Sequence, residues 1–449
     1  MGRGLPAGSV NPRVPVVRDF PVQPLLSAVS SPLSSLVARA AVPFEPLRGG
    51  GRGWTLLAVG VGWFFVLGLR FVVPALLPEI KPDFTLSNVG AGAAITLLWL
   101  TYALMQFPAG ILVDRLGERR LLAASALVAS VGLVGYAISP TFGVFLVATA
   151  VFGLGSGLYG PARGTVLTRA FPRRDGTAFG IVLAAGSIGA ALLPVIATLL
   201  ATVFDWRLAI AVTIPGFLVV AVALWHAVPA RTREREGSTA SSSTPQPDGG
   251  RAAGTDLAAI RRAIGTRRVV LAAVAVTVML FVFQGLSAFF VTYLAEEKSV
   301  GNGTAGALFG LLFVSGAAWQ TVGGTLGDRY GYGRVLAAVA VFGSVPLLVL
   351  PLVSGFVPLA LVAVALGVRL SAGPLSNAYI VATLPPAVRG TAWGLLRTGF
   401  FVVGAFGSIA VGAMADADRY TEAFVLLSVL SLLAAVVYLS LPARENLAA

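Results

Sequence analysis

The chain alternates long apolar runs with short charged turns, and this pattern constrains its fold more than any other feature. Of its 449 residues 57% are hydrophobic and 11% are charged, with a mean hydropathy of +0.87. A soluble domain has about 25% charged residues. A helix needs roughly 20 apolar residues to cross the hydrocarbon core of a bilayer. Each run of this length therefore predicts a transmembrane helix.

Twelve such runs are predicted, six on each side of a polar segment. They lie at 54–77, 88–112, 121–139, 142–168, 176–203, 207–228, 268–294, 303–326, 334–353, 356–382, 390–414 and 422–442. The predicted fold class is therefore an all-α integral membrane protein with two bundles of six transmembrane helices.

The apolar runs divide the chain into five parts. Residues 54–228 are predicted to form the N-terminal bundle and 268–442 the C-terminal bundle. Residues 229–267 are rich in Ser, Thr, Pro and Gly, which predicts a flexible linker. Residues 1–53 lack the continuous apolar core of a signal peptide, so we expect a disordered tail there and a short tail at 443–449.

Most basic residues lie on one predicted face of the membrane. Of the 32 lysines and arginines, 24 fall in the terminal tails, the linker and the loops that share one side with them. This asymmetry predicts that both termini are cytoplasmic in a protein of the cell membrane. No basic face with interleaved aromatic residues is left for DNA or RNA. The net charge of +13 is explained by topology.

The sequence offers few groups for catalysis. It has no cysteine, one histidine (His226), and 19 acidic residues that all fall in tails, loops or predicted helix ends. A Ser nucleophile would lack a base, and a metal ion would lack ligands. We therefore expect neither an enzyme nor a metal or cofactor site, and we expect an interfacial side chain at His226.

One short motif occurs twice, between the second and third runs and between the eighth and ninth. Gly110, Asp114, Arg115, Gly117 and Arg120 recur at a constant offset as Gly324, Asp328, Arg329, Gly331 and Arg334. A repeat over half the length indicates duplication of a six-helix unit. In such a motif glycine permits close helix approach, and the Asp caps a helix or pairs with Arg.

These residues resemble the loop signature of the major facilitator superfamily, G-x-x-x-D-R-x-G-x-R/K. The resemblance implies two six-helix bundles related by a pseudo-two-fold axis along the membrane normal. It also implies a monomeric secondary transporter that works by rocker-switch alternating access, with helices 1, 4, 7 and 10 around a central cavity. Asp114, Arg115, Asp328 and Arg329 would then act as gate and switch residues.

Four arginines fall inside predicted spans, namely Arg70, Arg163, Arg369 and Arg397. Placing a charged side chain at the bilayer centre costs about 2.5–3.5 kcal/mol on insertion scales. The presence of each arginine inside a span therefore has to be explained by a compensating contact or a function. Arg163 is close enough to the membrane surface to extend toward it. Arg397 is balanced between that behaviour and lining the cavity. Arg70 and Arg369 lie deeper and are predicted to be functional.

The predicted substrate is a small organic anion with a carboxylate or phosphate group. No acidic residue lies deep in a span, and guanidinium groups bind such anions in a bidentate manner. On the helices that the resemblance places at the cavity, the predicted binding residues are Arg70, Gln284, Arg369, Asn377, Tyr379 and Tyr159, with Arg397 as a second choice. The lipid bilayer is the other expected partner.

Two other functions remain as alternatives. A drug or cation–proton antiporter would normally use a membrane-embedded acid. The antiporter motif of the superfamily also has a Gly-Pro pair in helix 5. This chain has only part of that glycine pattern, Gly180, Gly186 and Gly189 followed by Pro194. A membrane scaffold or sensor that transports nothing is disfavoured by the retention of both loop motifs. Coupling stays open among symport with a proton, exchange and uniport.

Overall fold

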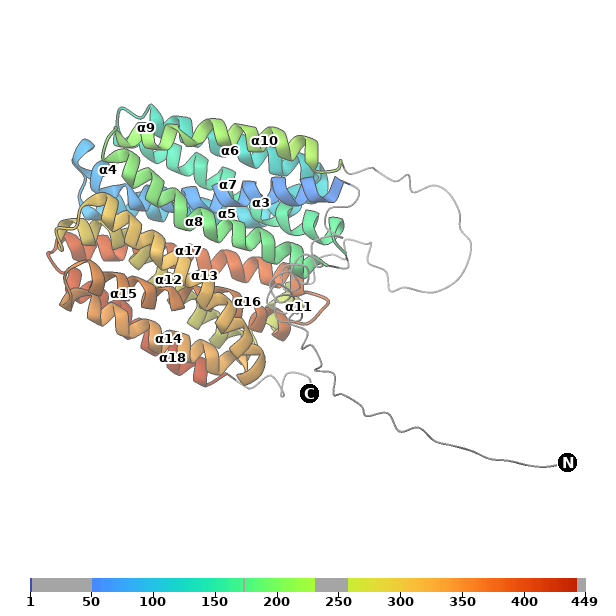
Figure 1. Ribbon diagram of the computed structural model, residues 1–449. Helices are drawn as coiled ribbons and strands as arrows, with labels where there is room; N and C mark the ends of the chain where they lie inside the picture. Colours follow the sequence, from blue (N-terminus) through green and yellow to red (C-terminus); the bar gives the residue numbers. More distant parts are fainter. Residues whose placement is uncertain (2–50, 173, 231–256, 442–449) are drawn as a thin grey trace. The chain divides into compact units, whose positions relative to one another are not determined.

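The computed structural model describes Met1 and residues 51–172, 174–230 and 257–441. In this part of the chain twelve helices are long and apolar enough to cross a membrane, and no strand is present (Figure 1). The predicted all-α fold with twelve transmembrane helices is thereby confirmed. The predicted tails and most of the predicted linker lie outside the described residues.

The first half, as named here, runs from α3 to α10. Its helices are α3 (Arg52–Ala75), α4 (Leu77–Asp83), α5 (Asn88–Leu116), α6 (Glu118–Ala137), α7 (Phe142–Ala170), α8 (Asp175–Ala201), α9 (Trp206–Ala211) and α10 (Thr213–Ala227). The short α4 connects the first two spans, and α9 with α10 makes the sixth.

The second half repeats this order after α11 (Leu257–Ile264), a short helix in the predicted linker. It comprises α12 (Arg267–Glu296), α13 (Asn302–Tyr330), α14 (Tyr332–Val349), η2 (Leu350–Leu352), α15 (Phe356–Leu366), η3 (Gly367–Ser371), α16 (Ala372–Thr383), α17 (Arg389–Asp416) and α18 (Tyr420–Leu439). Figure 1 shows the blue to green helices of the first half beside the yellow to red helices of the second.

The tenth span is interrupted, whereas the sequence predicted one run over 356–382. The 3₁₀ segment η3 separates α15 from α16 and contains Arg369. Gly367 begins it, and a Cβ there would lie 2.8 Å from the backbone nitrogen of Gly316 in α13. The close approach of these two backbones requires glycine at this position.

The two motif turns lie on one membrane face, here called the motif side, and the opposite face is called the far side. Gly117 ends α5 with φ 81°, and Gly331 ends α13 with φ 89°. Only glycine adopts this region readily, so both motif glycines terminate their helices for the same steric reason. The duplication predicted from the sequence thus recurs in backbone geometry.

The two halves are joined at the far side, where α5 packs against α17 and α8 against α13. The Thr96 hydroxyl donates to the carbonyl oxygen of Ala405 at 3.0 Å. Asp416 of α17 accepts from the backbone N–H groups of Asn88 and Val89, at 2.6 and 2.9 Å. A carboxylate from one half therefore caps the first helical turn of the other.

Small residues make this contact close. A Cβ at Gly92 would lie 2.6 Å from the carbonyl oxygen of Ser408, and one at Gly310 would lie 2.7 Å from that of Ala191. Each pair joins the two halves. The far side is closed by backbone-to-backbone packing that larger residues would prevent.

Candidate functional site

A cavity of about 480 Å³ lies between the halves and reaches the motif side. Ligand pockets usually measure about 300–1,000 Å³, so a small organic molecule fits this volume. Its lining residues include Gln106, Gly110 and Asp114 of α5, Gly160 and Arg163 of α7, and Trp393 and Arg397 of α17. The cavity includes Asp114, near the end of α5, so it opens toward the motif side, whereas the far side is closed.

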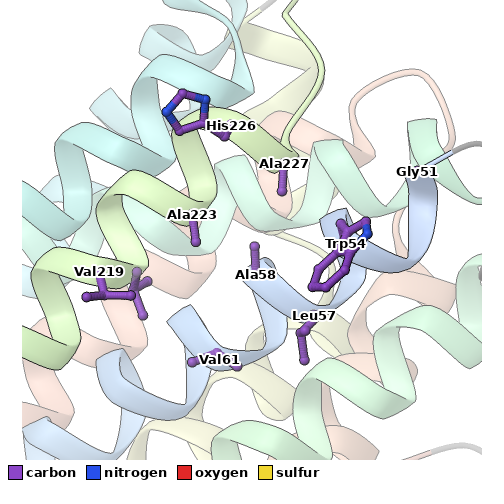
Figure 2. A pocket seen from close by; sticks show the side chains of 10 residues that line it. Gly51, Trp54, Leu57, Ala58, Val61, Val219, Ala223, His226 and Ala227 are labelled. Carbon is purple, nitrogen blue, oxygen red and sulfur yellow. The ribbon is translucent and has the colours of Figure 1, made fainter.

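A second cavity, of about 540 Å³, lies between the start of α3 and the end of α10 (Figure 2). Its lining is apolar except for His226, which is exposed at the end of α10. Figure 2 shows Trp54, Leu57 and Val219 around it. A groove with so few polar groups offers little to orient a charged or polar substrate, so the motif-side cavity is the candidate site.

Arg163 forms part of the wall of the motif-side cavity. Its guanidinium carbon lies 3.9 Å from the ring centroid of Trp63, which comes from α3. Its Nε and Nη1 atoms are buried and have no hydrogen-bond partner. The expectation that Arg163 extends toward the membrane surface is therefore wrong. The aromatic ring attracts the cation but gives these two buried donors no hydrogen-bond acceptor.

Arg397 approaches the same place from the second half. Its Nη2 donates to the hydroxyl of Tyr102 at 3.5 Å, and its guanidinium carbon lies 5.6 Å from the ring centroid of Phe401. Its Nε is buried without a partner. Of the two behaviours expected for Arg397, the geometry corresponds to lining the cavity.

Arg70 lies behind Tyr102 and is only 2% exposed. Its guanidinium carbon is 3.9 Å from the centre of the Tyr102 ring, and its Nη2 donates to the carbonyl oxygen of Ser156 at 3.3 Å. Trp63 and Trp99 lie beside it, at 5.3 and 5.7 Å. Tyr102 therefore contacts Arg70 through its ring and Arg397 through its hydroxyl. We call Arg70, Arg163 and Arg397 the arginine cluster.

None of the salt bridges found within the described residues involves the arginine cluster, and the carboxylate in the cavity lining is that of Asp114. The salt bridges found there join Lys81 to Glu296, Arg169 to Glu118, and Arg207 to Asp83 and Asp205. Aromatic faces stabilise a cation by about 0.5–2 kcal/mol each, which offsets only part of the cost of burial. The cluster therefore carries a positive field directed at the cavity between the halves.

Two other predicted binding residues lie on neighbouring helices. Tyr159 stacks on Trp63 with 5.9 Å between ring centroids, and its hydroxyl donates to the carbonyl oxygen of Val59 at 2.8 Å. It thus holds Trp63 under Arg163. Gln284 of α12 is buried, and its side-chain Oε1 has no hydrogen-bond partner.

The three predicted residues of the tenth span do not join the cluster. Arg369 turns into the second half, where its Nη1 donates to the carbonyl oxygen of Gly343 and to the hydroxyl of Ser431, both at 3.1 Å. Tyr379 is buried in the hydrophobic core of that half, and Asn377 is exposed. A binding role for these three residues stays a prediction.

The chain matches the family model of the Major Facilitator Superfamily over residues 58–373 and 273–448. The chain belongs to this superfamily. It is therefore a membrane transporter with the twelve-helix fold of that superfamily, as its loop motifs and its helices indicated.

Relatives within the superfamily carry general names. The "Uncharacterized MFS-type transporter YfnC" of Bacillus subtilis is 25% identical over 398 residues, which are 87% of this chain and 93% of the relative. The "Multidrug resistance protein Stp" of Mycobacterium tuberculosis is 28% identical over 175 residues. That match covers 38% of this chain and 33% of the relative.

Solved structures support the superfamily fold. A bacterial homologue of the human lysosomal transporter Spinster, in an inward-facing and unoccupied conformation, aligns with a TM-score of 0.69 and 18% identity. The alignment covers 87% of this chain and 96% of that one. A point mutant of the nucleoside transporter NupG aligns with a TM-score of 0.70 and 13% identity, over 86% and 99% of the two chains.

The superfamily loop motif is only partly packed in this conformation. Asp328 accepts a hydrogen bond from the hydroxyl of Tyr332 at 2.8 Å, and Arg329 lies beside the Tyr330 ring. A Cβ at Gly110 or Gly324 would meet no atom within 4 Å. The expected close helix approach at these two glycines is therefore absent here, because the halves are apart on the motif side.

Glu118 is a residue near the motif that sequence analysis overlooked. It follows Gly117 directly, is 3% exposed, and accepts from the guanidinium of Arg169 at 2.9 and 3.0 Å. This pair ties the start of α6 to the end of α7. Arg115, Arg120 and Arg334 are exposed on the motif side.

Proposed function

We propose that this transporter carries a small organic anion, with a carboxylate or phosphate group, by alternating access of its two halves. The observation that supports this proposal is the arginine cluster, in which three guanidinium groups meet near one cavity and take part in none of the salt bridges found among the described residues. A bound anion would supply the missing charge and accept hydrogen bonds from the guanidinium groups of Arg163 and Arg397, which both line the cavity.

The same residues suggest how binding drives the change of access. Arg163 belongs to the first half and Arg397 to the second, and both line the cavity. Two like charges on opposite halves oppose closure of the motif side. An anion between them would reverse the sign of that interaction and favour closure. We take the motif side as cytoplasmic, because most basic residues of the chain lie in the segments assigned to that face.

The second candidate is a multidrug efflux pump. It is favoured by relatives named for multidrug resistance and by the aromatic residues Phe107 and Trp393 in the cavity lining. Those matches cover about two fifths of this chain or less. A cationic drug in this cavity would approach the arginine cluster, so we rank this function below anion transport.

The first test is a thermal-shift screen of the purified transporter with organic acids, sugar phosphates and cationic drugs, followed by uptake into proteoliposomes. Arg397→Gln should raise the Kd of a stabilising anion about 10- to 150-fold, because a hydrogen bond to a charged group contributes about 1.5–3 kcal/mol. Arg419→Gln, an exposed arginine of the same half, is the matched control and should leave the Kd unchanged.

Stabilisation by cationic drugs and by no anion would contradict the proposal and favour the efflux function. Equal anion affinity in Arg397→Gln and Arg419→Gln would remove Arg397 from the site.

A further inference from the structure

Two glutamates lie in the far-side closure, in contrasting surroundings. Glu296 of α12 accepts from the ammonium of Lys81 at 2.6 Å and so forms an ion pair across the halves. Glu79 of α4 accepts from the amide of Asn302 at 2.8 Å through its Oε1. Its Oε2 is buried and has no hydrogen-bond partner. One carboxylate is therefore compensated by a cation, whereas the other receives only neutral donors.

Both contacts depend on the halves being together. Glu79 and Lys81 belong to α4 of the first half, while Glu296 and Asn302 belong to the second. Separation of the halves at the far side would break the Glu79–Asn302 hydrogen bond and admit water to Oε2. The solvation of Glu79 is thereby linked to opening and closing.

Among the described residues, no cation in the surrounding elements is available to Glu79. The charged side chains on and around α4 are its own Lys81 and Asp83, Asp205 and Arg207 at the start of α9, and Glu296, Glu297 and Lys298 at the end of α12. Arg207 pairs with Asp83 and Asp205. The facing turns of α3, α5 and α13 carry none. Lys81 binds Glu296, and Lys298 donates to the carbonyl oxygen of Pro351 at 2.6 Å.

A carboxyl group in these surroundings favours its neutral form, because burial penalises the charge. Burial raises the pKa of Glu79 to about 7, and the hydrogen bonds from its own backbone N–H and from the Asn302 amide oppose this rise only in part. A proton on Oε2 would remove the buried charge and keep Oε1 free to accept from Asn302. The closed far side thus fits a protonated Glu79.

We propose that Glu79 is a proton-binding site of the transport cycle, which takes up a proton when the far side closes and releases it when the far side opens. This inference rests on the alternating-access part of the proposed function and is independent of the charge of the substrate. It gives the transporter a coupling ion, bound at the closure and separate from the arginine cluster.

The direction of the pH effect follows from this linkage. When the far side is open, Glu79 is in water and ionised above its ordinary pKa of 4.5. When the far side is closed, Glu79 is protonated up to about pH 7. Between these values each unit of rising pH should lower the closed-to-open ratio by up to about tenfold. Above about pH 7 the ratio should no longer depend on Glu79.

The test measures the far-side distance directly. Val203 and Phe356 are exposed at the far side of the first and second halves, and the chain has no native cysteine to remove. Spin labels at Val203→Cys and Phe356→Cys in lipid nanodiscs, without substrate, should report a growing open population as pH rises from about 5 to about 8. Glu79→Gln, which mimics the protonated carboxyl, should stay closed throughout.

Two further variants control the interpretation. Glu297→Gln makes the same acid-to-amide change at an exposed glutamate of this face and should keep the wild-type pH response. Asn302→Ala removes the donor to Oε1, which should move the transition to higher pH, and it tests the site without altering Glu79.

The possible failures are distinguishable. A pH response that persists unchanged in Glu79→Gln and Asn302→Ala would overturn the proton site and leave alternating access intact. A distance that never changes, even in a variant that props the far side open, would overturn alternating access and with it this inference.

Discussion

Gly306 offers a direct way to prop the far side open. It lies in the first turns of α13 and faces Thr198 of α8, across the closure between the halves. A Cβ at Gly306 would overlap the Thr198 hydroxyl oxygen and would lie 2.8 Å from its Cβ and 2.9 Å from its Cγ2. Rotation of the threonine side chain leaves its Cβ in place, so the helices themselves must move apart.

The size of the effect follows from the cost of overpacking. One extra carbon in a well-packed contact costs about 1–3 kcal/mol. In Gly306→Ala this cost falls on the closed far side alone, because the contact is absent when the halves separate. The closed-to-open ratio should therefore fall about 5- to 150-fold. Alanine is also a better helix former than glycine, so the fold itself should be retained.

The assay is the distance between spin labels at Val203→Cys and Phe356→Cys, with a matched glycine as the control. Gly180 lies in α8, and a Cβ there would meet no atom within 4 Å, so Gly180→Ala should leave the distances unchanged. Thr198→Gly combined with Gly306→Ala moves the glycine to the facing helix and should restore closure.

The reasoning would be refuted if Gly306→Ala and Gly180→Ala gave the same distance distribution. Failure of Thr198→Gly to restore closure in the double variant would show that the overlap with Thr198 is not the cause.

Two remaining predictions concern residues that hold each half together. Arg369→Ala should lower the Tm, because it empties a buried volume beside Gly343 and so reduces the free energy of unfolding by about 2–5 kcal/mol. The KM for a transported anion should change less than twofold. A large rise in KM at unchanged Tm would instead assign Arg369 to binding. Glu118→Gln should lower the free energy of unfolding by about 1 kcal/mol, because the charge-assisted hydrogen bonds with Arg169 are lost. An unchanged Tm would show that this pair does not stabilise the contact between α6 and α7.

The helices and their order could be read from the chain because they depend on local composition. A span needs an apolar run of sufficient length whatever lies beside it, so the runs at 88–112 and 303–326 correspond to α5 and α13. The repeat of Gly117 as Gly331 was also visible in the sequence, and in the structure both residues take a positive φ that only glycine adopts readily.

Positions inside a helix were less predictable when the helix was not regular. Arg369 was expected at the central cavity because the superfamily resemblance places helix 10 there. The 3₁₀ segment η3 has about 3.0 residues per turn in place of 3.6, so it rotates the following side chains relative to a continuous α-helix. Arg369 lies within η3 itself and contacts Gly343 and Ser431 of its own half.

The sequence by itself determined that the chain is a membrane protein of two duplicated halves, because hydrophobic length and repeated turns are properties of single segments. Only the tertiary structure decided that Arg163 and Arg397 meet near Tyr102, since they come from helices far apart in the chain. It also decided that the Oε2 atom of Glu79 is buried without a partner while Glu296 is paired with Lys81. Which charges share a site depends on how helices pack and rotate against one another, and that is set by contacts between segments.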